Sequence, residues 1–292
     1  VGVIAFATTC QILVLSVFNG FEDLVKSLYA SFYADVKIIP AKGKTFTLTP
    51  LQISSIKQQQ GINAVSLIAE EKALIKNEES QAIIYLKGVD NNFMNVSGVP
   101  GKVVQGKFNT GTVDEPGLIV GYGVQNAAAV NVEGAFPPSV LTLILPKKGI
   151  TPVTDPLQAL SEGNVTATGV FMIQQDFDSK YAITNIDFVK QQMGFAANEF
   201  SAVEIRLNSK ANPKQAQQNL SKLLGSNYTV QTKYQQNTSL YTTMRLEKWF
   251  IYGVLTLILI IAAFNMISAL TMLVLEKQKD INVLQSMGAG KQ

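Results

Sequence analysis

WFIYGVLTLILIIAAFNMISALTMLVL, residues 249–275, is the stretch that decides how this chain of 292 residues is organised. It contains no Asp, Glu, Lys or Arg, and Glu276 follows it directly. An α-helix rises about 1.5 Å per residue, so about 20 apolar residues are enough to cross a hydrocarbon core about 30 Å thick. We therefore predict a transmembrane helix over residues 249–275.

A second uncharged run, VGVIAFATTCQILVLSVFNGF, occupies residues 1–21. It has no initiator Met, no basic leading region and no A-x-A-like cleavage site, so it does not fit a secretory signal. We predict a first transmembrane helix here, truncated at its N-terminus. Apolar residues recur with helical spacing from Phe21 to Phe32, which predicts that this helix continues beyond the span. Because both ends of the chain fall beside helices, we expect a fragment of a longer protein.

Residues 22–248 have the composition of an ordinary soluble domain and mix strand and helix patterns, which predicts an α+β fold between the two spans. We expect Thr49 to cap the first short helix of this domain and Pro50 to begin it. The glycine-rich residues 98–111 indicate a break, and the last elements alternate as in βαβ units. Residues 62–77 and 80–90 are predicted to form two or three strands, and the other predicted strands are residues 36–40, 117–121, 140–146, 166–173, 200–208 and 227–232. The predicted helices are residues 50–60, 122–130, 185–193 and 213–224, followed by an uninterrupted stalk helix over residues 233–248.

The composition excludes several classes of function. Charged residues make up 15% of the chain, against roughly 25% in an average soluble domain. The absence of His excludes Ser-His-Asp triads and His-ligated metal sites, and the single Cys10 excludes an intrachain disulfide. A net charge of +3 does not indicate nucleic acid as a partner. We therefore predict that the chain is not an enzyme and has no catalytic residues, no cofactor and no metal.

Three motifs resemble known kinds of site but lack residues that those sites need. GKVVQGKF, residues 101–108, has Phe108 where a phosphate-binding loop needs Ser or Thr, so we expect a turn. The acidic pairs at residues 70–71 and 176–178 lack a third ligand, which favours solvated faces. GYG, residues 121–123, lacks the third glycine of a dinucleotide-binding motif. By contrast, Asn265 and Ser268 lie inside the second span, where polar groups need partners, and we predict that they pack against other helices.

Two stretches resemble one protein family. VLSVFNGFE, residues 14–22, resembles the outer half of the first transmembrane helix of lipoprotein-releasing ABC transporter permeases, the LolC/LolE group of the FtsX/MacB superfamily. AAFNMISALTMLVLEKQKDINVLQSMGA, residues 262–289, is similar to the second transmembrane helix of that group and the segment after it. GLIVGYGVQNAAAVNVEG and TATGVF support the resemblance in the middle of the chain. The family implies a MacB-like periplasmic core between two transmembrane helices with helical stalks.

The resemblance also implies a location and partners. It places the chain in the bacterial inner membrane as a multi-pass protein, with residues 22–248 in the periplasm and residues 276–292 as a cytoplasmic coupling segment. Two further spans are expected beyond Gln292. The implied partners are a separate ATP-binding subunit, a second permease copy that is identical or different, a lipoprotein substrate and a LolA-like periplasmic carrier. The implied function is extraction of lipoproteins from the inner membrane and their transfer to that carrier.

The resemblance assigns residues to three roles. Coupling to the ATPase falls on Lys279, Asp280, Val283, Leu284 and Met287. A hook that binds the carrier falls on residues 146–164, with Lys147, Lys148, Thr151, Pro152 and Pro156; family arginines have no counterpart here, and the two lysines replace them imperfectly. The lipid cavity falls on Val17, Phe18, Phe21, Phe250, Val254 and Leu257, together with Val3, Phe6 and Leu13.

Alternatives stay open at the level of sequence. A MacB-like efflux permease and an FtsX-like regulator of cell-wall hydrolases share the same skeleton. A transmembrane receptor with a periplasmic sensing domain has the same order of segments, but it should continue into heptads, whereas Gly288 and Gly290 interrupt the helix pattern. The choice among LolC, LolE and a fused type also stays open, as does the set of lipoproteins.

Overall fold

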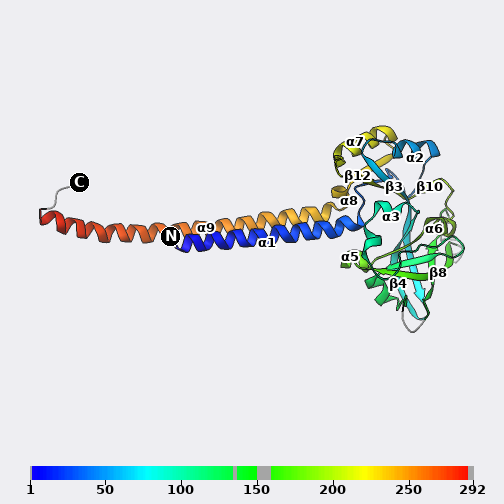
Figure 1. Cartoon of the computed structure of the whole chain (residues 1–292), viewed down its shortest axis with the longest axis horizontal. Coiled ribbons are helices and arrows are strands. Elements are labelled where there is room, and N and C mark those ends of the chain that lie inside the picture. The colour runs from blue at the N-terminus through cyan, green and yellow to red at the C-terminus, as the bar shows by residue number, and fades with distance from the viewer. Residues whose placement is uncertain (1, 134–136, 150–158, 289–292) are drawn as a thin grey trace. The chain divides into compact units, whose positions relative to one another are not determined.

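The computed structural model describes residues 2–133, 137–149 and 159–288 of the chain (Figure 1). Contacts divide the chain into two units. The core unit is Lys26–Asn237, and the helical unit combines Val1–Val25 with Thr238–Gln292. The core unit lies within the domain predicted over residues 22–248.

Two long helices provide the helical unit. Helix α1 spans Gly2–Phe32, so its last turns belong to the core unit, and α9 spans Thr238–Ser286. Helix α9 contains the predicted span, and it is the one helix among the described residues that is long and apolar enough to cross a membrane. Within the predicted span, residues 249–275, most side chains are exposed, and Ala262 is the buried one. Such a surface suits contact with lipid.

The stalk before the second span is interrupted, so the prediction of a continuous helix from residue 233 is wrong at one point. A single turn, α8 (Lys233–Gln236), is followed by Asn237 with φ −137° and ψ 57°, which is outside the helical region. The reason is local bonding to the core unit. The side chain of Gln235 accepts a hydrogen bond from the backbone N–H of Thr232, and the Gln236 amide donates to the carbonyl of Ala34 at 2.9 Å.

One mixed sheet organises the core unit. Its strands in the described residues are β1 (Val36–Pro40), β3 (Ile62–Asn77), β4 (Ser80–Val89), β5 (Val103–Gly106), β6 (Gly117–Gly121), β7 (Val140–Pro146), β8 (Leu160–Phe171), β9 (Tyr181–Asn185), β11 (Ala202–Leu207) and β12 (Tyr228–Thr232). The main order is β12-β1-β11-β3-β4-β9-β6-β8-β5, and β7 pairs with both β3 and β8. The short strands β2 (Phe46–Thr47) and β10 (Glu199–Phe200) form a separate pair.

The double pairing of β7 closes half of the sheet into a ring. In the order β3, β4, β9, β6, β8 and β7, each strand pairs with the next, and β7 returns to β3. Successive side chains of a strand point to opposite sides. Leu141, Leu143 and Leu145 of β7 are fully buried, alternate with more exposed neighbours and belong to the main hydrophobic cluster. Side chains therefore fill the interior of a small barrel.

Helices pack against the sheet in two groups. The helices α2 (Pro50–Lys57), α6 (Ile186–Met193) and α7 (Pro213–Leu224) each bury residues in the main hydrophobic cluster, namely Ile56, Phe188 and Leu220. Three elements, α3 (Phe93–Val96), α5 (Gln175–Asp178) and the end of α1, instead bury aromatic side chains that do not belong to this cluster. The remaining short helix, α4 (Tyr122–Ala127), follows β6.

Many of the predicted elements are confirmed at their predicted bounds, namely the strands at residues 36–40, 62–77, 117–121 and 140–146 and the helix at residues 213–224. Thr49 caps α2, and Pro50 begins it. The predicted break at residues 98–111 is wrong in part, because it contains the 3-10 turn η1 (Val99–Lys102) and strand β5, which pairs with β8. The predicted βαβ order is split, since β1 lies between β11 and β12 and is antiparallel to both.

Candidate functional site

An apolar groove runs along the helical unit. Its volume is about 460 Å³, and it is lined by Leu13, Val14, Val17, Phe18 and Phe21 of α1 and by Ile251 of α9. The four positions from Val14 to Phe21 follow the i, i+3, i+4, i+7 spacing of one helix face. The structure therefore brings together four of the α1 residues that were predicted to line a lipid cavity, Leu13, Val17, Phe18 and Phe21, whereas the predicted Phe6 does not line this groove. The predicted residues of α9, Phe250, Val254 and Leu257, do not line this groove, and Ile251 takes their place.

A polar contact joins the two helices of this unit beside the groove. The Lys248 ammonium of α9 lies 3.3 Å from a Glu22 carboxylate oxygen and 3.2 Å from the Asn19 side-chain oxygen of α1. Asn19 and Glu22 follow the groove residues Phe18 and Phe21 directly in the sequence. Ion pairs between partly exposed side chains stabilise little, so the contact mainly fixes which faces of the two helices meet.

The polar side chains of the second span differ in where they find hydrogen-bond partners. The hydroxyl of Ser268 donates to the carbonyl oxygen of Phe264 at 3.1 Å, and that of Thr271 donates to Ile267 at 2.8 Å. Both groups are thus satisfied within α9. Asn265 is exposed, and its side-chain amide finds no hydrogen-bond partner among the described residues. Of the two residues predicted to pack against other helices, Asn265 is the one that needs a group from outside this part of the chain.

The predicted coupling residues fall at the end of α9. Lys279, Asp280, Val283 and Leu284 lie in its last turns, and Met287 follows its last residue. The exposed fractions of Val283, Leu284 and Met287 are 59%, 55% and 79%. Their i, i+1, i+4 spacing gives one apolar stripe, which begins one turn after Asp280. This arrangement is able to dock on a partner protein.

The predicted hook lies at the end of an antiparallel hairpin. Pro146 of β7 pairs with Leu160 of β8, so residues 160–164, predicted as part of the excursion, belong to the strand. The backbone N–H of Lys147 donates to the carbonyl of Ala159 at 2.8 Å, which continues the ladder by one more step. Three of the predicted hook residues, Thr151, Pro152 and Pro156, lie outside the described residues.

Lys148 fixes the base of this hairpin. Its ammonium is hydrogen-bonded to the carboxylate of Glu199, whose side chain is only 4% exposed. Glu199 also accepts a hydrogen bond of 2.5 Å from the hydroxyl of Thr45 and one from the backbone N–H of Ala196. Burial alone would raise the pKa of Glu199, but these hydrogen bonds, with Lys148 first, hold the pKa below its usual value. The ammonium of Lys148 is therefore paired with Glu199, which leaves Lys147 as the more available of the two predicted lysines.

We predict that Glu199→Gln lowers the free energy of unfolding by about 1–2 kcal/mol at pH 7, because it weakens charge-assisted hydrogen bonds. Since the pKa of Glu199 is lower in the folded state than in the unfolded state, its stabilisation is present above about pH 5 and is lost as the pH falls through the lowered value. Denaturant unfolding at a series of pH values should show the two proteins converging in acid. The exposed Glu79→Gln serves as the control, with little change at any pH. A difference that is independent of pH would contradict the prediction.

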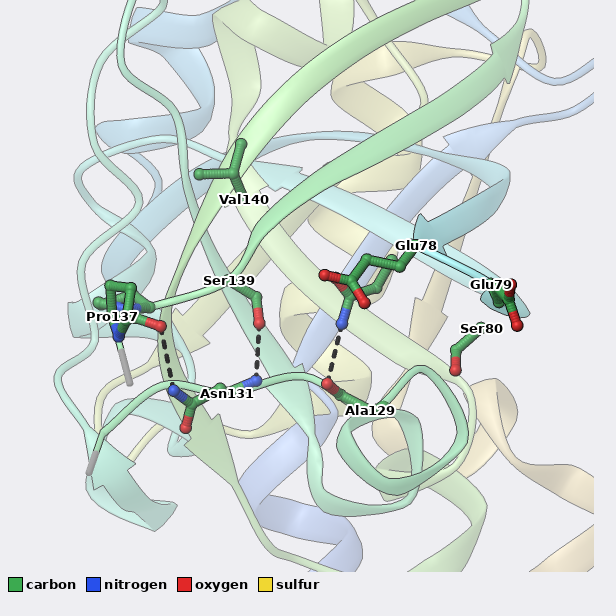
Figure 2. A pocket seen from close by; sticks show the side chains of 10 residues that line it. Glu78, Glu79, Ser80, Ala129, Asn131, Pro137, Ser139 and Val140 are labelled. Atoms are coloured by element: carbon green, nitrogen blue, oxygen red, sulfur yellow. Dashed lines mark hydrogen bonds between the residues drawn. The ribbon is translucent and has the colours of Figure 1, made fainter. Parts of the chain in front are cut away.

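A polar hollow of about 760 Å³ lies where the turn between β3 and β4 meets the segment after α4 (Figure 2). The Asn77 amide donates to the carbonyls of Ala128 and Ala129 at 3.0 Å and 2.8 Å. Two carboxylates, Glu78 and Glu79, line the hollow, but the described residues contain no group of three acidic, His or Cys side chains that could hold a metal ion. The hollow can make polar contacts and offers no recognisable catalytic arrangement.

The acidic pairs set aside in the sequence have structural partners. Glu71 pairs with Lys44 at 2.7 Å, and the carboxylate of Asp178 accepts the backbone N–H of Ile173 at 2.9 Å. Asp176 accepts a hydrogen bond of 2.7 Å from the hydroxyl of Tyr29. The predicted solvated face is wrong for Asp178, which is 7% exposed because its carboxylate caps the backbone N–H of Ile173.

Relatives with curated names match almost the whole chain. A lipoprotein-releasing system transmembrane protein LolC from Neisseria meningitidis is 27% identical over 98% of this chain and 67% of its own length. A LolE protein of the same system from Haemophilus influenzae is 24% identical over 98% of this chain and 68% of its own length. The resemblance to the LolC/LolE group is therefore confirmed. These relatives also support the broader functional prediction, a permease of the MacB-like and FtsX-like superfamily.

Solved structures give more distant similarity. The periplasmic region of MacB from Actinobacillus actinomycetemcomitans has a TM-score of 0.49 and 12% identity, covering 75% of this chain and 98% of that region. The extracellular domain of the transporter YknZ from Gram-positive bacteria has a TM-score of 0.45 and 17% identity, covering 68% of this chain and 99% of that domain. The family described as MacB-like periplasmic core domain matches residues 1–223, most of the chain. The chain therefore belongs to the MacB-like periplasmic core domain family.

Proposed function

We propose that this chain is a permease subunit of an ABC transporter that extracts lipoproteins from the inner membrane and passes them to a periplasmic carrier. The observation that supports this proposal most strongly is the similarity to lipoprotein-releasing transmembrane proteins. It extends over 98% of the chain and includes both long helices as well as the core unit. The apolar groove supports the proposal, because six apolar residues line a surface to which acyl chains could bind. ATP hydrolysis then belongs to a separate ATP-binding subunit.

The chemistry of the substrate explains why such a transporter needs ATP. Each buried CH₂ group of an acyl chain contributes about 0.8 kcal/mol to membrane anchoring, so spontaneous extraction of several chains is very slow. A groove of Val, Leu, Ile and Phe side chains replaces part of the lost lipid contact during extraction. Helix α9 is continuous from Thr238 to Ser286, so it can carry a movement from the coupling residues to the start of the stalk. In this proposal the protein is a multi-pass inner-membrane protein that works with a second permease copy.

The hairpin of β7 and β8 is the proposed contact with a LolA-like carrier. Its end lies at the segment that the family resemblance assigns to a hook, and the pair of Lys148 and Glu199 fixes its base. Lys147 then supplies positive charge next to that base. We propose that the hook contacts the carrier through Lys147 and the residues that follow, while Lys148 holds the hairpin in position.

The groove provides the test of the proposal. We expect Val17→Trp to reduce ATP-dependent release of a fluorescent triacylated lipoprotein at least about tenfold, a change of about 1.4 kcal/mol in transition-state stabilisation, because the indole fills the groove. Proteoliposomes containing the permease pair and its ATPase, with the carrier in solution, allow release and ATP hydrolysis to be measured together. ATP hydrolysis should stay near the wild-type rate.

Leu259→Trp is the matched control, since it introduces the same side chain at an exposed apolar position of α9 that neither lines the groove nor belongs to the predicted lipid cavity. Its release should stay within about twofold of the wild type, because a large apolar side chain is readily accommodated at a lipid-facing position. Equal release by Val17→Trp and Leu259→Trp would remove the groove from the mechanism. A wild-type protein that releases no lipoprotein under any condition would instead favour an efflux or regulatory permease.

A further inference from the structure

The end of α1 is buried in the core unit by an aromatic cluster. Phe32 is 3% exposed, and its ring stacks on Phe177 of α5 with centroids 4.2 Å apart. The hydroxyl of Tyr29 donates to Asp176, and the carbonyl of Ser31 accepts the backbone N–H of Gly98 at 2.9 Å. The last turn of α1, which belongs to the core unit, is therefore held in a defined seat formed by Gly98, Asp176 and Phe177.

A buried ion pair lies next to this aromatic cluster. The ammonium of Lys87 on β4 lies 2.7 Å from a carboxylate oxygen of Glu204 on β11, and the two side chains are 2% and 3% exposed. Strand β3 lies between β4 and β11, so the pair crosses over a strand. The same ammonium lies 5.0 Å from the ring centroid of Phe32 and 5.2 Å from that of Phe93. Both distances are within the range of cation–π attraction.

Stability alone does not account for this pair. Removing two charges from water costs several kcal/mol per ion, so well-packed apolar residues often stabilise a fold as well as a buried ion pair does. The pair is also incompletely satisfied, because the second carboxylate oxygen of Glu204 has no hydrogen-bond partner among the described residues. Buried charges retained in such a setting serve orientation in the best-attested cases.

Two further charged side chains lie beside the pair. Lys37 on β1 lies 3.9 Å from Glu204 and 3.8 Å from Glu70 on β3. Burial alone would lower the pKa of Lys37, but the carboxylates of Glu70 and Glu204 outweigh burial and raise it. The four side chains thus lie on four adjacent strands, β1, β11, β3 and β4, with the two carboxylates between the two ammonium groups. Glu204 is fixed from two sides, and it in turn fixes the ammonium of Lys87.

We infer that Lys87 is a positioning residue whose ammonium, held by Glu204, seats Phe32 and thereby locks the last turn of α1 to the core unit. The inference about the seat rests on geometry alone. Its consequence for transport rests on the proposed function, in which movements of the membrane helices must reach the core unit. A locked seat makes the last turn of α1 and the strands β4 and β11 respond as one body.

The test compares hydrogen–deuterium exchange of the full-length protein in lipid nanodiscs for the wild type and the double variant Lys87→Met with Glu204→Met. The double variant removes both charges, so neither partner is left buried and unpaired. We expect a thermal midpoint within a few degrees of the wild type and at least about tenfold faster exchange at residues 29–33, because local opening sets the exchange rate. Exchange in α7, which lies on the other side of the sheet, should not change. Unchanged exchange at residues 29–33 would overturn the inference.

A double-mutant cycle with Phe32→Leu separates seating from a general loss of packing. If Lys87 acts through Phe32, adding Phe32→Leu to the double variant should accelerate exchange no further than either change does alone. Additive acceleration would show that the two sites act independently and would also overturn the inference.

The consequence for transport is tested by measuring lipoprotein release by the same variants in the proteoliposome assay. Reduced lipoprotein release with normal ATP hydrolysis is the result expected if the seat carries movement. Faster exchange in a protein whose wild-type form releases no lipoprotein would support the seat and reject the proposed function. Failure of the inference about the seat and failure of the proposed function therefore give different experimental results.

Discussion

Replacing Gly121 with alanine is expected to lower the free energy of unfolding of the core unit by about 3–5 kcal/mol, a large part of the roughly 5–15 kcal/mol that stabilises a native domain. Gly121 ends β6, and a Cβ atom at this position would lie 2.3 Å from the carbonyl oxygen of Asp178 and 2.7 Å from its Cα. Both neighbours are backbone atoms of α5, so no side-chain rotation can relieve the overlap. The chain would have to move α5 away from the sheet.

The matched control for this change is Gly101→Ala. A Cβ atom on Gly101 would meet no atom within 4 Å, and the backbone there does not need glycine. Both variants add one methyl group at a glycine of the core unit, so only the local space differs. Thermal unfolding of the full-length protein, followed by circular dichroism, should show a large loss for Gly121→Ala and a small change for Gly101→Ala. Equal midpoints would contradict the steric argument.

The same contact explains the GYG motif. A Cβ atom on Gly123 would lie 2.7 Å from the Cα of Ser179, so both glycines allow α5 to approach β6 and α4 closely. In the sequence this motif resembles half of a dinucleotide-binding turn. Its spacing alone does not distinguish a ligand that approaches the backbone from another piece of backbone that does so. In this fold the close neighbour is the chain itself.

Local patterns predicted the strands well but not their pairing. The seven residues of β7 alternate in burial, as a strand with one buried face should, and its bounds were predicted correctly. That alternation is the same for an open sheet and for a barrel. Closure depends on pairs such as Leu74 with Ile144, which are far apart in the sequence. The sequence contains no local signal for such a pairing.

The burial of the two charged side chains Lys87 and Glu204 was not predicted, for a related reason. Lys87 and Glu204 are each flanked by apolar residues in strands, a pattern in which a single charge normally faces water. Here the end of α1 and α3 cover that face, so the charges pair and become buried. Two opposite charges in the middle of otherwise apolar strands were the available signal. Likewise, helical spacing identified the groove residues of α1, whereas Ile251 depends on which face of α9 meets them.

The second large effect concerns the continuity of α9. We expect replacement of Glu276, Lys277 and Gln278 by three glycines to reduce ATP-dependent lipoprotein release at least about tenfold, while ATP hydrolysis stays within about twofold of the wild type. These residues lie in α9 between the predicted span and the coupling residues Val283 and Leu284. Each glycine weakens a helix by about 1 kcal/mol relative to alanine, so one turn loses about 3 kcal/mol of helical preference.

Replacement of the same three residues by alanine is the control that isolates helix continuity. Both variants remove the charges of Glu276 and Lys277, and both remove the exposed pair between Lys277 and Asp280, which lie 3.2 Å apart. Alanine favours the helix, so this variant should keep release near the wild-type level. If α9 transmits movement as a stiff rod, only the glycine variant uncouples hydrolysis from release. Equal release by both variants would mean that the coupling residues act without a continuous helix, and equal loss would assign the effect to the charges.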